Sequence, residues 1–203
     1  AQKASIENIK NTSSKTPSKM AVDGTIGKKG TVELSQDCIL GPEVAPAELL
    51  KEIVKIQPDK ILTPLLNTRT SCCQKITPEE ILRWQRRDIS QPLLRIDDEN
   101  GQEASTQIFR NLLSYMNDRK SSKKPILHVK KIIHIVLVNE PLLKDEAYLQ
   151  VYKQIHDNPK HANIMRGWKE MAILSSCFVP SNQDIYYFLL NFLFFELKNN
   201  KDP

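Results

Sequence analysis

The chain has 203 residues, of which 40% are hydrophobic and 26% charged, and its formal net charge is +5. This balance is typical of a folded protein and excludes wholesale disorder, and the length suits one ordinary domain with an extension. The densest apolar stretch, residues 185–197, is interrupted by polar residues and is shorter than the roughly 20 residues that cross a membrane. No signal peptide is visible, and the cysteines form no C-x-x-C pair, so we expect free thiols and a cytoplasmic location.

The positive charge is concentrated at the N-terminal end. Residues 1–30 hold six lysines and two acids, whereas the remaining 173 residues hold 23 basic and 22 acidic residues. Because residues 1–30 contain no Phe, Trp, Tyr or Leu, we expect residues 1–44 to form a flexible basic leader. Its contact with an anionic membrane would be weak, since it has no apolar face. The rest of the chain is nearly neutral, which argues against a nucleic-acid-binding domain.

Residues 45–76 are expected to form an accessory helical segment. A helix is predicted to open at Pro46, because the apolar residues that follow have helical spacing. A second short piece, 59–66, lies between two prolines, and a polar loop is expected over 67–76.

The sequence Thr77-Pro78-Glu79-Glu80 predicts a helix start. The Thr77 hydroxyl can accept a hydrogen bond from the Glu80 amide while the Glu80 carboxylate reaches back, and proline suits the first helical position. This helix is expected to carry Ile81, Leu82 and Trp84 and to stop before Pro92, as the first part of a helical domain over residues 77–203.

Five further helices are expected, each with apolar residues at helical spacing. They cover about 102–118, 126–138, 142–155, a stretch centred on Trp168 and a last one with Ser181 as N-cap and its apolar face running from Ile185 to Phe195. Residues 126–138 are apolar on several sides, which predicts a largely buried helix, although their β-branched residues would also suit a strand. The sequence thus predicts an all-α, compact bundle of about six to eight helices.

Several segments in this region resemble the myosin tail homology 4 domain. They are 109–118 (FRNLLSYMND), 142–155 (LLKDEAYLQVYKQI), Asn158-Pro159, Arg166-Gly167-Trp168 and 178–181 (FVPS). Their order over residues 84–197 makes the resemblance specific, and the triplet Pro92-Leu93-Leu94 also resembles the start of that domain.

The chain departs mildly from the family pattern at Asn117, Lys144 and Val179, where Gly, Arg and Pro are usual. Each matching motif also has a structural interpretation: acids in a first helical turn, packing tyrosines, and a glycine that admits a neighbouring helix. The structural-motif residues are Asp145, Glu146, Tyr148, Arg166, Gly167, Trp168 and Pro180.

No motif in the sequence indicates an enzyme. We find no G-x-S-x-G, glycine-rich phosphate loop or H-E-x-x-H, so we expect no catalytic residue, cofactor or metal. His128 and His134 are six residues apart and do not share a helix face, and His156 and His161 are expected at helix ends rather than at a metal.

Between residues 119 and 131 the sequence RKSSKKPILHVKK contains six basic residues and no acid. A charge run is usually a solvated surface, but this one could also attract an acidic partner. The candidate partner-binding residues are Arg119, Lys120, Lys123, Lys124, Lys130 and Lys131.

The resemblance implies a module of the cytoskeleton, since the family occurs in myosin tails, plant kinesins, pleckstrin-homology proteins and Rho GTPase-activating proteins. It implies an adaptor that binds microtubules or another acidic protein within a larger motor or signalling protein. The alternative is a structural spacer that supports a neighbouring FERM or Rho GTPase-activating domain in small-GTPase regulation.

Overall fold

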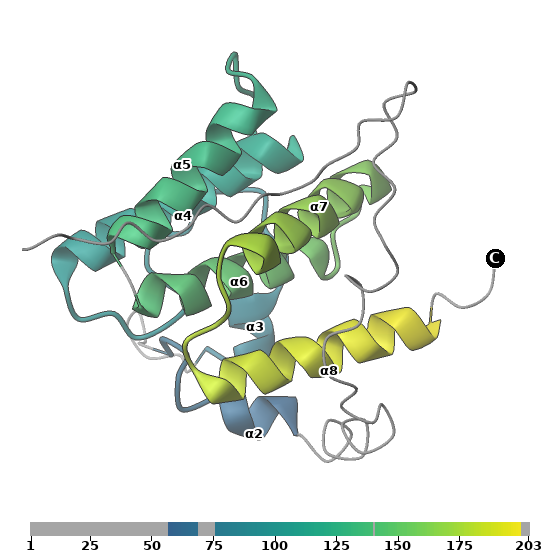
Figure 1. Ribbon diagram of the computed structural model, residues 1–203. Helices are drawn as coiled ribbons and strands as arrows, with labels where there is room; N and C mark the ends of the chain where they lie inside the picture. The colour runs from purple at the N-terminus through teal and green to yellow at the C-terminus, as the bar shows by residue number, and fades with distance from the viewer. Residues whose placement is uncertain (1–56, 69–75, 140, 200–203) are drawn as a thin grey trace, which may run out of the picture. The chain divides into compact units, whose positions relative to one another are not determined.

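The computed structural model describes residues 57–68, 76–139 and 141–199, and these form seven helices (Figure 1). The helices are α2 (Pro58–Leu62), α3 (Pro78–Leu82), α4 (Glu99–Met116), α5 (Pro125–Val138), α6 (Leu142–Ile155), α7 (His161–Cys177) and α8 (Gln183–Asn199). The all-α prediction is confirmed: the β pairing in these ranges is one isolated bridge. The predicted leader and the helix expected at Pro46 lie outside the described residues. None of the described helices is long and apolar enough to cross a membrane.

Helix α6 lies at the centre of the bundle. It packs against α3, α4, α5 and α7, and its Tyr152 ring contacts two phenylalanines of α8. Eleven of its residues are buried, including the polar Gln150 and Lys153. In Figure 1, α6 lies between the α4–α5 pair and α8. A helix buried on most sides cannot be amphipathic, which explains why its sequence mixes buried polar and apolar residues.

Residues 57–68 share the core of the later helices. Leu62 and Leu66 are 1% and 0% exposed, and Leu66 forms an antiparallel bridge with Leu94. The amide of Asn67 donates to the Leu93 carbonyl over 2.6 Å. Burying a leucine contributes about 1.5–3 kcal/mol. We therefore propose that residues 57–68 belong to the same folding unit as α4–α8.

The predicted capping box at α3 is confirmed, but the helix is shorter than expected. The Thr77 amide donates to Glu80 Oε2 over 2.9 Å, and the Thr77 hydroxyl accepts from the Glu80 amide. The helix ends at Leu82, and Arg83 is extended. The buried Lys153 ammonium donates to the carbonyls of Ile81 and Arg83, so a tertiary contact caps the helix where local sequence gives no stop signal.

Helix α5 is confirmed as a helix, but the prediction that it is largely buried is wrong. Ile126, Leu137 and Val138 are 53%, 51% and 67% exposed. The buried residues are on one side: His128, Val129, Ile132 and Val136. Helix α5 packs mainly on α4, at the edge of the bundle, so its outer face has no described neighbour.

Two details of α8 also differ from the prediction. The Asn182 side-chain oxygen accepts from the amides of Asp184 and Ile185, so Asn182 and not Ser181 is the N-cap. Ser181 instead donates its amide to Asp145 and its hydroxyl to the Pro141 carbonyl. Phe195, expected in the core face, is 44% exposed.

Candidate functional site

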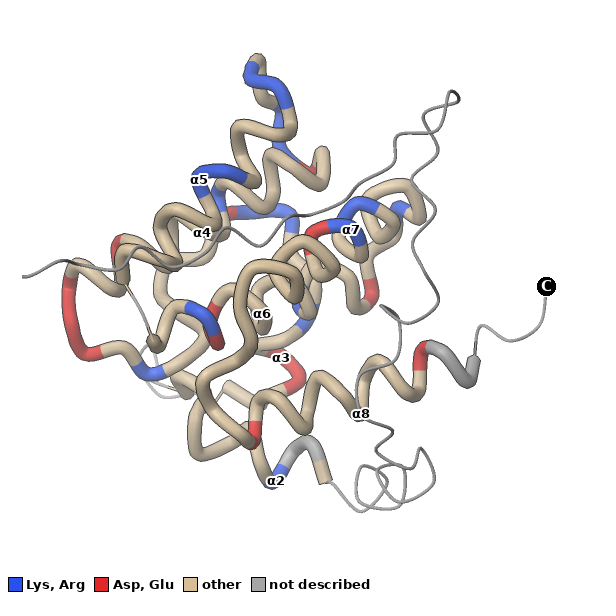
Figure 2. The backbone as a smooth tube through the Cα atoms, viewed as in Figure 1, with Lys and Arg blue, Asp and Glu red and all other residues tan. Residues whose placement is uncertain are grey.

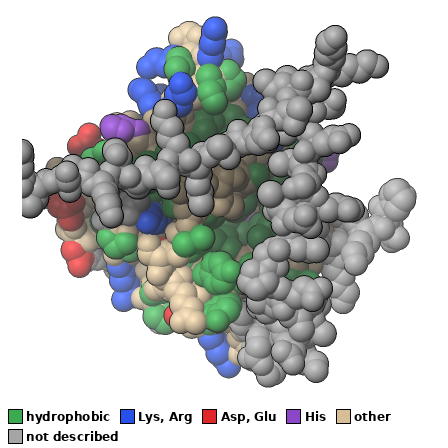
Figure 3. Space-filling view, viewed as in Figure 1, with side chains coloured by type: hydrophobic (Ala, Val, Ile, Leu, Met, Phe, Trp, Pro, Cys, Tyr) green, Lys and Arg blue, Asp and Glu red, His purple; other side chains and the backbone are tan. Residues whose placement is uncertain are grey.

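A basic groove lies at the end of the bundle where α4 turns into α5. Figure 2 shows Lys and Arg residues gathered at this turn, and Figure 3 shows basic and hydrophobic side chains together over it. The groove has a volume of about 320 Å³, and the described residues that line it include no carboxylate. Its lining residues are Gln107, Arg110, Asn111, Ser114, Arg119, Lys120, Ser121, Lys123, His128 and Lys131.

The structure brings four of the six predicted partner-binding residues into this groove. Arg119, Lys120, Lys123 and Lys131 line it, whereas Lys124 and Lys130 are exposed nearby but outside its lining. Sequence reasoning missed Arg110. The available signal was the polar stripe of α4, since Gln107, Arg110 and Ser114 recur at helical spacing on the side away from its apolar residues.

The two arginines of the groove are partly neutralised by one acid. Arg110 Nε lies 3.1 Å from Asp88 Oδ2, and Arg119 Nη1 lies 3.5 Å from the same oxygen. All three side chains are more than a third exposed, so these ion pairs contribute little to stability. The lysines of the groove form no ion pair with any described acid, and they therefore carry its uncompensated charge.

His128 forms the floor of the groove and is neutral. Its Nδ1 lies 3.0 Å from Asn111 Oδ1, which can only accept, so Nδ1 carries the proton and Nε2 accepts from the Ser121 hydroxyl over 2.8 Å. Burial lowers the pKa of His128, and the nearby charges of Lys123, Lys131 and Arg119 lower it further. At pH 7 this residue thus positions the turn rather than adding charge.

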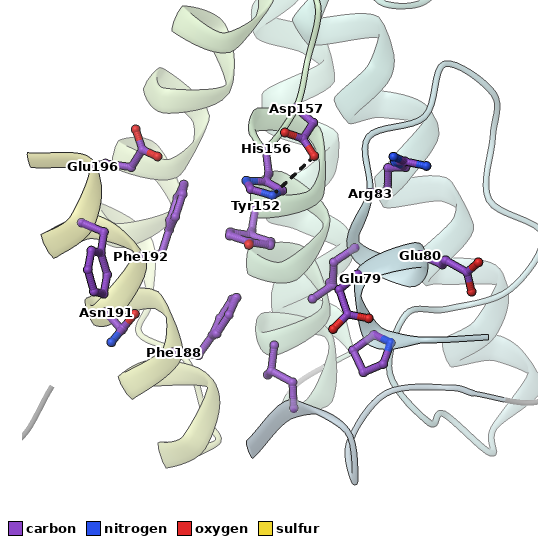
Figure 4. A pocket seen from close by; sticks show the side chains of 14 residues that line it. Glu79, Glu80, Arg83, Tyr152, His156, Asp157, Phe188, Asn191, Phe192 and Glu196 are labelled. Carbon is purple, nitrogen blue, oxygen red and sulfur yellow. Dashed lines mark ion pairs between the residues drawn. The ribbon is translucent and has the colours of Figure 1, made fainter. Parts of the chain in front are cut away.

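A larger cleft lies between α8, α6 and α3 (Figure 4). It has a volume of about 680 Å³, and Phe188 and Phe192 of α8 point toward Tyr152. Its His156 and Asp157 lie 3.5 Å apart, but its described lining contains no serine, threonine or cysteine nucleophile. No cluster of three potential metal ligands occurs among the described residues. The described part of the cleft thus offers an aromatic surface.

The predicted motif residue Glu146 joins three parts of the chain. It is fully buried, and its carboxylate accepts from the amides of Leu93 and Leu94 at 2.9 and 2.8 Å. The Ser105 hydroxyl and the Gln150 side chain also donate to it, both over 2.8 Å. Burial raises the pKa of Glu146, and these hydrogen bonds oppose that rise. Its role is therefore tertiary, beyond the favourable position in a first helical turn that the sequence indicated.

Asp145 and Tyr148 hold the turn that precedes α8. Asp145 accepts from the amides of Ser181 and Asn182, at 2.7 Å for the shorter bond. The Tyr148 hydroxyl donates to the Phe178 carbonyl over 2.6 Å. Pro180, another predicted motif residue, lies between these two attachment points.

The segment Arg166-Gly167-Trp168 joins α7 to three neighbouring helices. Arg166 Nη1 donates to the Tyr115 carbonyl of α4 over 3.3 Å. Trp168 stacks on Phe192 of α8, with ring centroids 5.3 Å apart and planes at 7°. At Gly167, the helix passes against Ile155 of α6, where no side chain would fit.

Comparison with known proteins agrees with this architecture. Residues 129–202 match the family model described as the MyTH4 domain. The chain is 32% identical over 116 residues to unconventional myosin-VIIb of Mus musculus and 34% identical over 119 residues to myosin-VIIa of Drosophila melanogaster. These matches cover 51% and 57% of this chain but only 5% of either relative, so the chain spans a small part of their length.

Solved structures share the fold. The MyTH4-FERM MF1 domain of Dictyostelium discoideum myosin VII superposes with a TM-score of 0.60 at 24% identity, covering 81% of this chain and 31% of that one. A mutant of the MF2 domain of the same myosin gives a TM-score of 0.60 at 18% identity over 72% of this chain and 29% of its own. The family match thus shows a MyTH4 domain over residues 129–202, and the solved structures show that its fold is shared.

Proposed function

We propose that this MyTH4 domain is a cytoskeletal adaptor that binds an acidic protein surface, that of microtubules foremost, through the groove between α4 and α5. The observation that carries the proposal is the convergence of Lys120, Lys123 and Lys131 in one groove whose described lining has no acid. A local field of one sign attracts an opposite charge and speeds its encounter, even where net charge is modest.

The composition of the groove suits carboxylates. Lysine ammonium groups and the guanidinium of Arg119 donate charge-assisted hydrogen bonds, and Asn111, Ser114 and Gln107 add neutral polar groups. The neighbouring exposed Ile126 and Leu127 would give such a partner an apolar contact beside the charged one. An acidic segment with interspersed apolar residues thus fits this surface better than a bare polyanion does.

The relatives support the cellular setting that we propose. The curated relatives are unconventional myosins, and the solved structures carry a MyTH4 domain together with a FERM domain. We propose that this chain likewise acts beside a FERM domain in a longer, cytoplasmic, cytoskeleton-associated protein. The MyTH4 domain would contribute binding, and motor activity would belong to other parts of that longer protein.

Microtubule co-sedimentation of the 203-residue chain at low and moderate ionic strength tests the proposal. The double variant Lys120→Glu/Lys123→Glu is expected to weaken binding about tenfold or more, because it reverses two charges inside the groove. Binding should also weaken with salt, since screening acts over roughly 10 Å at 0.1 M. The matched control is Lys60→Glu/Lys169→Glu, which changes the same charge at exposed lysines that do not line the groove.

Equal loss in both double variants would show that net charge alone drives binding and would contradict a groove-specific site. A chain lacking residues 1–30 is also expected to bind. If only the full 203-residue chain binds, the six lysines of residues 1–30 are responsible and the groove is not the site. If the intact chain does not bind microtubules or a glutamate-rich peptide, the adaptor proposal fails. The structural spacer for a FERM domain, suggested by the MyTH4-FERM neighbours, would then be favoured.

A further inference from the structure

Ser122 lies in the turn between α4 and α5, inside the sequence Arg119-Lys120-Ser121-Ser122-Lys123-Lys124. Residues 119–127 are all exposed. Residues 120–122 make no backbone–backbone hydrogen bond within the described ranges. A partner enzyme can therefore draw this turn into an extended conformation without breaking the hydrogen bonds of either helix.

The two adjacent serines differ in their surroundings. The Ser121 hydroxyl bonds His128 Nε2 over 2.8 Å and accepts from the Lys123 amide over 3.1 Å. The Ser122 hydroxyl has no hydrogen-bond partner in the part of the chain that the structure describes. Modifying Ser121 would break contacts that fix the turn, whereas modifying Ser122 breaks none. The structure thus distinguishes two residues that the sequence alone presents as equivalent.

We propose that Ser122 is a phosphorylation site for a serine/threonine protein kinase whose substrate cleft is acidic, and that the phosphate switches off the basic groove. Arg119 and Lys120 lie three and two residues before the acceptor, and two lysines follow it. Such a charge pattern is the kind by which kinases select substrates. The regulatory half of this inference rests on the proposed binding function.

The chemistry is an ordinary phosphoryl transfer. The Ser122 hydroxyl oxygen bonds to the γ-phosphorus of a magnesium-bound nucleoside triphosphate, and the bond from that phosphorus to the β,γ-bridging oxygen breaks. The nucleoside diphosphate leaves, and the hydroxyl proton passes to a carboxylate base of the kinase. No residue of this chain takes part except the acceptor.

The phosphate changes the charge of the turn by about as much as one Lys→Glu substitution does. Residues 119–124 carry four positive charges and no acid, and a phosphoserine adds about −1.5 to −2 at pH 7. Its three oxygens accept hydrogen bonds from neighbouring ammonium and guanidinium groups, so Lys120, Lys123 and Arg119 become paired within the chain. The groove then loses its attraction for an acidic partner.

The test begins with the 203-residue chain, a purified basophilic serine/threonine kinase and magnesium ATP. Phosphopeptide mapping by mass spectrometry is expected to find phosphate on Ser122 and none at this turn in Ser122→Ala. The matched control Ser121→Ala should retain the modification at Ser122. Phosphate on Ser121 in place of Ser122, or an unmodified turn, would overturn the assignment of the site.

The second readout is binding of a fluorescent glutamate-rich peptide before and after the kinase reaction. Phosphorylation is expected to weaken binding about tenfold in the wild-type chain and to leave Ser122→Ala unchanged, which separates Ser122 from serines of the leader. Equal affinity before and after modification of Ser122 would overturn the switch. No binding by the unmodified chain would instead refute the proposed function, while the phosphate map still decides the site.

Discussion

A Cβ atom added at Gly167 would lie 2.6 Å from Cγ1 of Ile155, closer than packed carbon atoms approach. Helices α6 and α7 therefore meet at a point where only glycine fits without displacing a neighbour. This glycine belongs to the Arg166-Gly167-Trp168 motif, and the close approach of the two helices is the physical reason for it.

Gly167→Ala is expected to destabilise the fold by about 1–3 kcal/mol, the usual cost of overpacking a core. Alanine has a higher helix propensity than glycine, which by itself would stabilise α7. A net loss of stability would therefore have to come from the steric clash. Chemical denaturation measures the change. In an Ile155→Ala background the same substitution should cost clearly less, and an undiminished cost would show that Ile155 is not the obstacle.

Glu146→Ala is expected to lower the free energy of unfolding by about 2–5 kcal/mol, because it leaves the buried amides of Leu93 and Leu94 without an acceptor. The exposed Glu103→Ala on α4 is the control and should change stability by less than about 0.5 kcal/mol. Urea denaturation gives both values. Similar, small effects for the two substitutions would contradict the structural role of Glu146.

Glu170 makes stability depend on pH. It is fully buried on α7, neither carboxyl oxygen has a hydrogen-bond partner among the described residues, and burial raises its pKa to about 7. Because the folded-state pKa lies above the unfolded value of 4.5, the folded state binds the extra proton between these values. Stability is unaffected below pH 4.5, falls as the pH rises toward 7, and carries the whole penalty above pH 7.

Glu170→Gln removes this penalty. The free energy of unfolding of the variant is expected to exceed that of the wild type by about 3 kcal/mol at pH 8.5 and to differ little from it at pH 4.5. This follows from about 1.4 kcal/mol for each unit by which the pKa is shifted. Denaturation curves at the two pH values test it. A gain of the same size at both would mean that better packing, not ionisation, is responsible.

Asn117 adopts a left-handed conformation, with φ of 69°, at the C-cap of α4. This geometry explains why glycine is usual at the position and why asparagine replaces it with little strain. Asn117→Gly should be neutral or slightly stabilising, whereas Asn117→Ala should cost about 1 kcal/mol. Melting temperatures rank the three proteins, and a ranking with alanine above asparagine would contradict the observed backbone.

Local sequence determined much of the helical framework. Apolar periodicity and caps act within a few residues, so the capping box of Thr77 and the apolar face of α4 follow from neighbouring residues alone. The resemblance to the MyTH4 domain followed from short motifs in fixed order, and one of their residues, Gly167, lies where two helices approach closely.

Tertiary structure alone decided which residues meet. Arg110 joined the basic groove because α4 and α5 pack side by side, and α5 exposes its outer face because no described helix covers it. Glu146 and Lys153 look like surface charges in sequence, yet both are buried at the ends of long-range hydrogen bonds. The spacing of apolar residues predicts which face of a helix is apolar. Burial and the clustering of charges depend instead on contacts between residues far apart in the chain.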